Sequence, residues 1–154
     1  MTDDTAAQET GGRAESFDII QRELTAFSRR ARATAARLHP ELPLVSQSLL
    51  SHIHEQQGCR ATDLAAHYML DKSTVSRQVT ALERLGLIER HPDPEDQRIH
   101  VLHPTPAGLR ALVSTQASRR AAYQERLAEW TTEDLAAFAR YLLRYNVASN
   151  STDE

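Results

Sequence analysis

The stretch from Asp71 to Arg90, DKSTVSRQVTALERLGLIER, constrains the fold of this chain more than any other. On a helix, where successive residues turn by about 100°, it has two different sides. One is an apolar stripe, roughly 120° wide, that requires burial and consists of Val75, Val79, Leu82 and Leu85. The opposite side, about 60° wide, carries Ser73, Arg77, Thr80 and Arg84. Asp71 suits the N-cap because its carboxylate accepts from the first free N–H groups.

The polar side of this helix has two interpretations. It is either the solvated face of an ordinary amphipathic helix or a face that lies in a DNA major groove. On the second interpretation, the small hydroxyls allow close approach and the arginines reach guanine edges or phosphates. This interpretation predicts DNA contacts from the helix and from the strand that follows it. The predicted contact residues are Lys72, Ser73, Thr74, Ser76, Arg77, Thr80, Arg84 and Arg90. The sequence after Arg90 favours this second interpretation.

A β-hairpin is predicted directly after the central helix. Residues 87–91 and 98–103 have the pattern of two short strands, and the segment between them contains two prolines and three acids, which is typical of a turn. Before the central helix, Thr62 is predicted to cap a short helix, and Cys59-Arg60 to form a short strand. Two short helices joined by a tight turn and followed by a hairpin indicate a winged helix-turn-helix.

Long helices are predicted on both sides of this module. Apolar residues three or four apart predict helices over 17–38, 106–129 and 132–147. Together these helices have more apolar surface than one small module can cover. Pairing with the same helices of a second subunit, about a two-fold axis, would bury that surface. Such a homodimer would place two recognition helices about one DNA turn apart on a palindrome.

The predicted fold class is therefore mainly α with a small β-wing, a winged helix-turn-helix flanked by long N- and C-terminal dimerisation helices. Residues 1–15 are polar, acidic and glycine-punctuated, and are expected to form a flexible tail because they bury too little surface to offset ordering. The remaining segments are a dimerisation helix at 16–40, the winged helix-turn-helix at 43–103, the C-terminal dimerisation helices at 104–148 and a frayed tail at 149–154.

Composition excludes some classes of protein but does not indicate a nucleic-acid binder. The net charge is −3, and residues 59–103 hold six Lys and Arg against seven Asp and Glu. A DNA-binding role must therefore rest on where the positive charges lie. No apolar run approaches the roughly 20 residues of a membrane span, and the amino terminus lacks the apolar core of a signal peptide. The single cysteine excludes an internal disulfide. We expect a soluble cytoplasmic protein with no membrane partner.

Three stretches resemble the MarR family of bacterial transcriptional regulators: LAAHYMLDKSTVSRQVTALERLGLIER, DPEDQR and TPAG. The resemblance covers nearly the whole chain, from the first predicted helix to the last. It implies a winged helix-turn-helix whose flanking helices, from both termini, build a homodimer. The family's recognition helix corresponds here to residues 72–85.

The resemblance also implies roles for the hairpin. The family's wing carries an Asp-x-Arg motif, matched here by Asp96-Gln97-Arg98. Arg98 is then expected to enter the minor groove, oriented by Asp96, because a narrow minor groove concentrates negative potential that favours a guanidinium. The family usually has Leu-Thr before the long helix. This chain has Pro104-Thr105 instead, so the second strand is expected to end one residue earlier.

Members of the family often carry a small-molecule pocket where the first and second helices of one subunit meet the DNA-binding module. The candidates to line that pocket here are Arg30, His39 and Ser46. A small-molecule effector is therefore a further expected partner, of a kind that the sequence does not specify.

Other kinds of site find less support. There is no glycine-rich phosphate loop, nucleophile elbow or acid pair with an obvious cleft, so we predict neither an enzyme nor a cofactor. The seven histidines form no cluster with ligand spacing, so no metal site is predicted, although one assembled across helices stays open. Cys59 is most simply a small buried residue. Some relatives sense oxidants through a cysteine in the first helix, whereas Cys59 lies elsewhere, beside the predicted strand of the wing; a redox role for it stays open.

Together these features predict a homodimeric regulator that binds a palindromic operator in double-stranded DNA and represses transcription by competing with polymerase. The alternative is a winged-helix protein–protein interaction module without specific DNA binding. The exposed Ser73/Arg77/Thr80 face and Arg98 on the wing distinguish the two, because a module that does not bind DNA has little reason to keep both.

Overall fold

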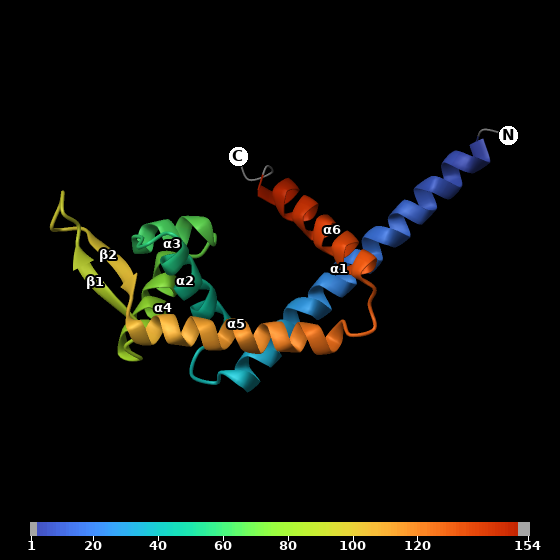
Figure 1. Ribbon diagram of the computed structural model, residues 1–154. Coiled ribbons are helices and arrows are strands. Elements are labelled where there is room, and N and C mark those ends of the chain that lie inside the picture. Colours follow the sequence, from blue (N-terminus) through green and yellow to red (C-terminus); the bar gives the residue numbers. More distant parts are fainter. Residues whose placement is uncertain (1–2, 151–154) are drawn as a thin grey trace. The chain divides into compact units, whose positions relative to one another are not determined.

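The computed structural model describes the backbone of residues 3–150 and the side chains of residues 12–148. The chain divides into two compact units, one ending at Thr115 and one beginning at Gln116, and this boundary lies within helix α5. Figure 1 labels the elements, which are α1 (Asp3–Leu38), α2 (Leu44–Glu55), α3 (Ala61–His67), α4 (Lys72–Arg84), β1 (Ile88–Pro92), β2 (His100–Pro104), α5 (Pro106–Arg126) and α6 (Thr132–Asn150). The mainly helical fold with a two-stranded wing is confirmed.

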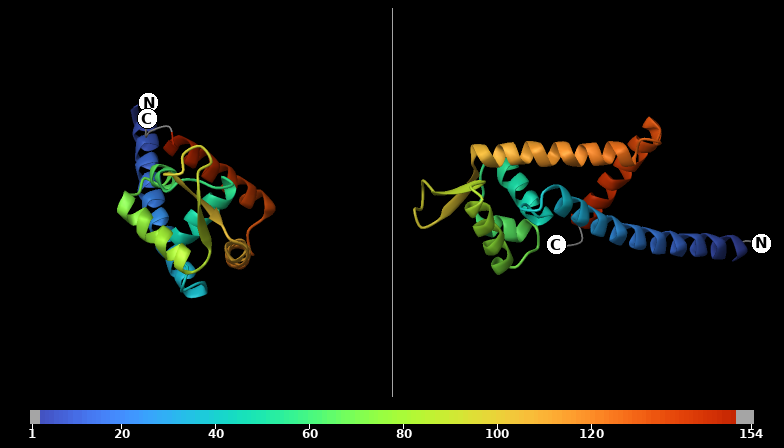
Figure 2. Two further views of the ribbon diagram at one scale, coloured as in Figure 1. Left: turned by 90° about the vertical axis from the view of Figure 1, so that its left-hand side faces the viewer. Right: turned by 90° about the horizontal axis from the view of Figure 1, so that it is seen from below.

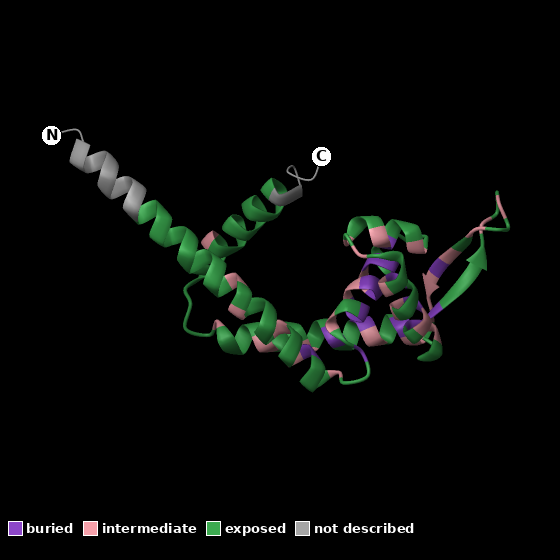
Figure 3. Cartoon of the chain, turned by 180° about the vertical axis from the view of Figure 1, so that it is seen from behind, coloured by how far each residue is buried: buried purple, intermediate pink, exposed green. Residues whose placement is uncertain are grey.

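The core of the first unit lies among α2, α3, α4 and the hairpin, where the buried residues gather in Figure 3. The predicted stripe of α4 is confirmed for Val75, Val79 and Leu82, which are at most 1% exposed. They pack with residues of the neighbouring elements, including Leu49, Leu50, Ile53, Leu64 and Leu102. Leu85 was expected on the same stripe but is exposed, because α4 ends at Arg84 and Leu85 lies beyond the last helical turn.

The hairpin is antiparallel, with Ile88 opposite Pro104 and Pro92 opposite His100. Figure 2 shows it extending beyond helices α2–α4 of its own unit. The expectation that the second strand ends before Pro104 was wrong. Proline at the last position of a two-stranded ribbon leaves no ladder hydrogen bond unmade, and Thr105 continues the pairing by donating from its backbone N to Leu87 O at 3.0 Å.

The segment before α3 differs from the prediction in two ways. Cys59 forms a single β-bridge to Leu102 of β2, and Cys59-Arg60 is not a strand. The N-cap of α3 is Arg60, where Thr62 was expected. The cap works because the Asp63 carboxylate accepts from the backbone N–H of Arg60 at 3.0 Å.

Helix α1 begins at Asp3, so residues 3–15, predicted as a flexible tail, are helical in the structure, and residues 1–2 lie outside the described part. The segment is polar, but alanine, glutamate and glutamine are good helix formers. An acidic start also complements the positive end of a helix. Because the amphipathic part of α1 already supplies the costly helix nucleus, extension toward the amino terminus is easier than composition suggests.

The start of α5 explains the TPAG motif. Thr105 Oγ1 accepts from the Gly108 backbone N at 3.0 Å, which caps the helix, and donates to Gly86 O at 2.6 Å. A Cβ at Gly108 would lie 2.0 Å from the carbonyl oxygen of Leu87. The absence of a side chain at Gly108 therefore lets α5 approach the segment between α4 and β1.

The second unit contains the end of α5 and helix α6. Thr131 Oγ1 accepts from the Asp134 backbone N at 3.1 Å, and the Trp130 and Phe138 rings lie with centroids 5.5 Å apart. Of the residues predicted to fray, 149 and 150 are helical in α6, and 151–154 lie outside the described residues. Within residues 3–150, no helix is both long and apolar enough to span a membrane.

Candidate nucleic-acid interface

The amino end of α4 is built around the Asp71 carboxylate. One of its oxygens accepts from the Thr74 backbone N at 2.8 Å and from the Ser73 hydroxyl. The other oxygen accepts from Thr74 Oγ1 at 2.8 Å. These hydrogen bonds, that from Ser73 foremost, hold the pKa of Asp71 well below its usual range. The Ser73 and Thr74 hydroxyls were predicted to contact DNA, and in the isolated chain both donate to this N-cap.

Arg77 lies one turn further along α4. Its guanidinium Nη2 donates to Thr74 Oγ1 at 3.3 Å, so Asp71, Thr74 and Arg77 form a chain of hydrogen bonds along the start of the helix. Arg77 and Ser76 are exposed, whereas Thr80 is only half-exposed. The exposed face of α4 therefore presents Arg77 in a partly fixed orientation.

The positive charges of α4 are Lys72, Arg77 and Arg84, and the charge of Arg77 is near enough to the Asp71 carboxylate to help lower its pKa. Among the described residues, no acidic side chain forms an ion pair with Lys72, Arg77 or Arg84. Most acids of residues 59–103 are instead engaged within the module, by helix caps or by other side chains, and these are Asp63, Asp71, Glu83, Glu89, Asp93 and Asp96. Although the segment has more acids than bases, α4 thus presents unpaired cations at its surface.

Arg90 differs from the other predicted contact residues. Its guanidinium donates to the carboxylate of Glu83 through Nε at 2.7 Å and Nη2 at 2.9 Å. This pair lowers the pKa of Glu83 and raises that of Arg90, mainly through the hydrogen bonds themselves. The pairing connects α4 to β1 and engages the guanidinium of Arg90 more fully than that of Arg77.

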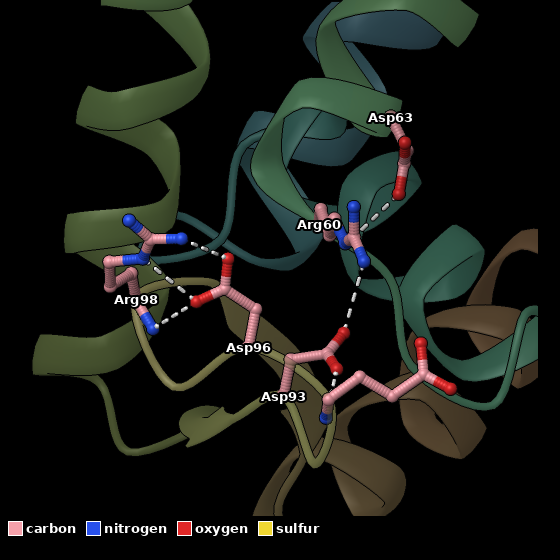
Figure 4. Close-up of polar contacts among 6 residues, drawn as sticks. Arg60, Asp63, Asp93, Asp96 and Arg98 are labelled. Carbon is pink, nitrogen blue, oxygen red and sulfur yellow. Dashed lines mark hydrogen bonds and ion pairs between the residues drawn. The ribbon is translucent and has the colours of Figure 1, made fainter.

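The wing tip presents Arg98 to solvent. Its side chain is 90% exposed, yet Nε and Nη2 donate to the two carboxylate oxygens of Asp96 at 3.0 and 3.1 Å, and its backbone N donates to the same carboxylate at 3.1 Å (Figure 4). The hydrogen bonds from Arg98 lower the pKa of Asp96. Three hydrogen bonds from one residue to one carboxylate restrict the guanidinium despite its exposure.

The three predicted pocket residues have separate surroundings. Arg30 lies 3.9 Å from Glu23, and both side chains are more than half exposed. Ser46 is buried and donates to Gln78 Oε1 of α4 at 2.6 Å. The Nε2 atom of His39 is buried, and no hydrogen-bond partner for it is found among the described residues.

Sequence reasoning missed a cluster of three rings between α2 and α3. The buried His52 lies with its ring centroid 4.3 Å from His67 and 5.6 Å from Tyr68, whose hydroxyl donates to Ser48 O at 3.0 Å. Burial, and then the proximity of His67, lowers the pKa of His52. The position of His52 between the core residues Leu49 and Ile53 was the available signal. In the described part of the chain, no three His, Cys, Asp or Glu side chains are grouped to hold a metal.

Cys59 is buried beside the wing. Desolvation raises the pKa of its thiol to about 11, and Asp63 adds to the shift. Because the thiolate is the reactive form, a thiol with this pKa is inert at neutral pH. These surroundings support the structural interpretation of Cys59 over a redox role.

Comparison with known proteins gives three findings. The sequence model of the MarR family matches residues 42–100. The chain is 36% identical over 133 residues to YxaD of Bacillus subtilis, an uncharacterized HTH-type transcriptional regulator, covering 85% of this chain and 93% of that protein. It is 33% identical over 98 residues to a putative transcriptional regulatory protein for the hcr operon of Thauera aromatica, covering 62% and 57%.

Solved structures show the same fold. A crystal structure of MarR matches with a TM-score of 0.79 at 24% identity, covering 86% of this chain and 91% of that one. The transcriptional regulator SlyA matches with a TM-score of 0.75 at 21% identity, covering 86% and 94%.

Proposed function

The chain belongs to the MarR family of transcription regulators, which are not enzymes, and on that premise we propose that it binds a palindromic operator in double-stranded DNA as a homodimer. One observation carries the proposal. Two separate elements of the same module, α4 and the wing, present exposed arginines, Arg77 without an acidic partner among the described residues and Arg98 held by Asp96. This is the arrangement needed to contact a major groove and the adjacent minor groove together.

In this proposal the contacts to DNA divide by element. The exposed residues of α4, Lys72, Ser76, Arg77 and Arg84, meet base edges and phosphates in the major groove, and Arg98 enters the minor groove. Ser73 and Thr74 lie at the same end of α4 and contact the DNA backbone only where their hydroxyls turn from the Asp71 carboxylate to a phosphate. Thr80 is half-buried, so in this proposal only its methyl group contacts the DNA. Arg90 braces the wing and contacts DNA least.

The homodimer is proposed because each unit exposes large apolar side chains. Helix α1 exposes Phe17, Ile20 and Phe27, and helix α6 exposes Tyr141 and Leu143. A surface of this kind marks an interaction site more often than it stays in water. A two-fold partner would cover the same residues on both chains and place two copies of α4 on successive half-sites.

Repression in the cytoplasm, relieved by an effector, completes the proposal. A dimer that covers two successive major grooves competes with polymerase for an overlapping promoter. A small molecule that binds near Arg30, His39 and Ser46 would act on α4 through the Ser46–Gln78 hydrogen bond. The buried Nε2 of His39, which has no hydrogen-bond partner within the described part of the chain, is a polar group that such a ligand would satisfy.

The proposal is tested by selecting duplexes from a random-sequence pool with the wild-type protein, then measuring fluorescence anisotropy at two salt concentrations with unlabelled nonspecific competitor. We expect a selected site with two-fold symmetry, saturable binding that resists competitor and falls steeply with salt. Light scattering of the complex should give two chains per duplex. Binding that competitor abolishes would instead support the winged-helix protein-interaction alternative.

A further inference from the structure

Arg60 occupies a doubly fixed position between the helix-turn-helix and the wing. The residue before it, Cys59, exchanges two backbone hydrogen bonds with Leu102 of β2, at 3.2 and 2.8 Å. On the other side, Asp63 accepts from the Arg60 backbone N–H at the start of α3. The Arg60 side chain therefore starts from a backbone that is anchored both to the hairpin and to the helix.

The Arg60 guanidinium reaches the first residue after β1. Its Nη2 donates to Asp93 Oδ2 at 3.0 Å, across 33 positions of sequence (Figure 4). The Asp93 side chain is only 14% exposed, and its other oxygen accepts from the Glu95 backbone N at 2.9 Å. The Asp93 backbone N donates to Ile99 O at 2.8 Å. Asp93 thus joins α3 to both ends of the wing turn.

The same turn holds the Asp96–Arg98 pair. The Ile99 backbone N donates to Asp96 O at 2.9 Å, which closes a four-residue turn, 96–99, that contains Arg98. A two-stranded hairpin is marginally stable alone, because it has little core of its own. At the wing tip, polar contacts must therefore supply the rigidity that packing supplies elsewhere.

We propose that Arg60 is a positioning residue for the wing, and that its ion pair with Asp93 fixes where the Arg98 guanidinium meets the DNA. This inference rests on the proposed DNA-binding function. A wing held in place before binding loses less conformational freedom on the DNA, so the pair improves affinity without touching a base. The ion pair affects DNA affinity only by positioning Arg98. Its loss should therefore weaken binding mainly on the DNA sequences that Arg98 favours.

The direction in which one substitution changes DNA affinity distinguishes a positioning role from a purely electrostatic effect. Asp93 is an acid next to a DNA-facing loop, so removing its charge should strengthen DNA binding if the ion pair has no positioning role. If the pair positions the wing, Asp93→Asn should weaken binding although it removes a negative charge. Arg60→Gln alone is less decisive, because a direct phosphate contact of Arg60 would also be lost.

Glu95 offers a matched control. It lies in the same turn and carries the same charge, its side chain is exposed, and the contact that involves it is made by its backbone N. Glu95→Gln therefore removes one acid from the wing and leaves the Arg60–Asp93 pair intact. We expect Glu95→Gln to leave affinity unchanged or to tighten it about two-fold.

The experiment measures anisotropy on duplexes recovered by selection with the wild-type protein, with either A·T-rich or G·C-rich flanks. On A·T-rich flanks we expect Arg60→Gln and Asp93→Asn each to weaken binding about three- to ten-fold, and to cause no further loss when Arg98 is already alanine. Tighter or unchanged binding of Asp93→Asn, or equal losses with and without Arg98, would overturn the inference.

A measurement without DNA keeps this result separate from the proposed function. Hydrogen exchange of the Glu95 and Ile99 amides should accelerate in Arg60→Gln and Asp93→Asn and stay at the wild-type rate in Glu95→Gln. Unchanged exchange in the first two variants would show that the ion pair does not hold the wing. A wild-type protein that binds no selected duplex would overturn the proposed function, while the exchange rates still decide whether Arg60 holds the wing.

Discussion

Glu83 and Arg90 form a bidentate ion pair, with two parallel hydrogen bonds of 2.7 and 2.9 Å, between the last turn of α4 and strand β1. The pair fixes the start of the wing against the helix that we propose as the recognition helix. Together with Arg60 and Asp93 at the far end of β1, it ties this strand to the helix-turn-helix at two points. The relative orientation of α4 and the wing, the two elements that we propose contact DNA, is therefore stabilised by side chains that need not contact DNA themselves.

Glu83→Gln should lower the free energy of unfolding by about 0.5–1 kcal/mol, the range for an ion pair that is partly screened by water. The two side chains are 31% and 38% exposed, so a larger loss is not expected. Urea denaturation of Glu83→Gln, Arg90→Gln and the double variant would measure the coupling between them. Strictly additive losses would show that the two residues do not interact in solution.

Gly108→Ala should destabilise the first unit by about 1–3 kcal/mol, as expected for an inserted methyl group that cannot be accommodated. Its Cβ would meet the Leu87 backbone, which cannot rotate away as a side chain does. Gly12→Ala is the matched control, since Gly12 is also helical but has open space around it. That substitution should stabilise α1 by up to about 1 kcal/mol. Thermal unfolding of both variants checks the difference in sign.

Arg77→Ala should cost about 1–3 kcal/mol of DNA-binding free energy and relax base preference at the contacted position. Repeated selection from the random pool with the variant would reveal the relaxed position. Arg29→Ala, which removes an exposed arginine from α1, is the control and should leave the selected site unchanged. An equal loss on every sequence would mean that Arg77 contacts phosphate only.

The wild-type protein should lose stability as the pH falls below about 6.5, the usual pKa of histidine. The folded state lowers the pKa of His52, so it binds that proton less tightly than the unfolded state does. The loss begins as the pH falls through the unfolded value and stops below the folded one. The groups that face His52 are His67 and Tyr68, with Glu55 and Asp63 nearby.

Urea denaturation between pH 7.5 and 5 would measure this effect. His52→Gln should flatten the pH dependence, because it removes the titrating group, whereas substitution of the exposed His54 by glutamine should keep it. A profile that is the same in the wild type and in His52→Gln would assign the pH dependence to other groups.

Local relationships in the sequence predicted much of the fold. The stripe of Val75, Val79 and Leu82 follows from the helical period, and the Asp71 cap from a carboxylate three residues before an N–H group. Asp96 and Arg98 are two residues apart, so their contact could also be predicted from the sequence. The amino terminus was predicted less well, because composition there favours a tail while helix propensity and the adjoining helix favour extension of α1.

The sequence by itself determined which side chains of α4 share a face and where that helix begins, because both depend on residues within a few positions of each other. Only the tertiary structure decided which distant side chains meet. Arg60 with Asp93, Ser46 with Gln78 and His52 with His67 are pairs of this kind. Their contacts depend on how α2, α3, α4 and the hairpin pack around one core. That packing is set by the shape of many side chains together, and no spacing in the sequence encodes it.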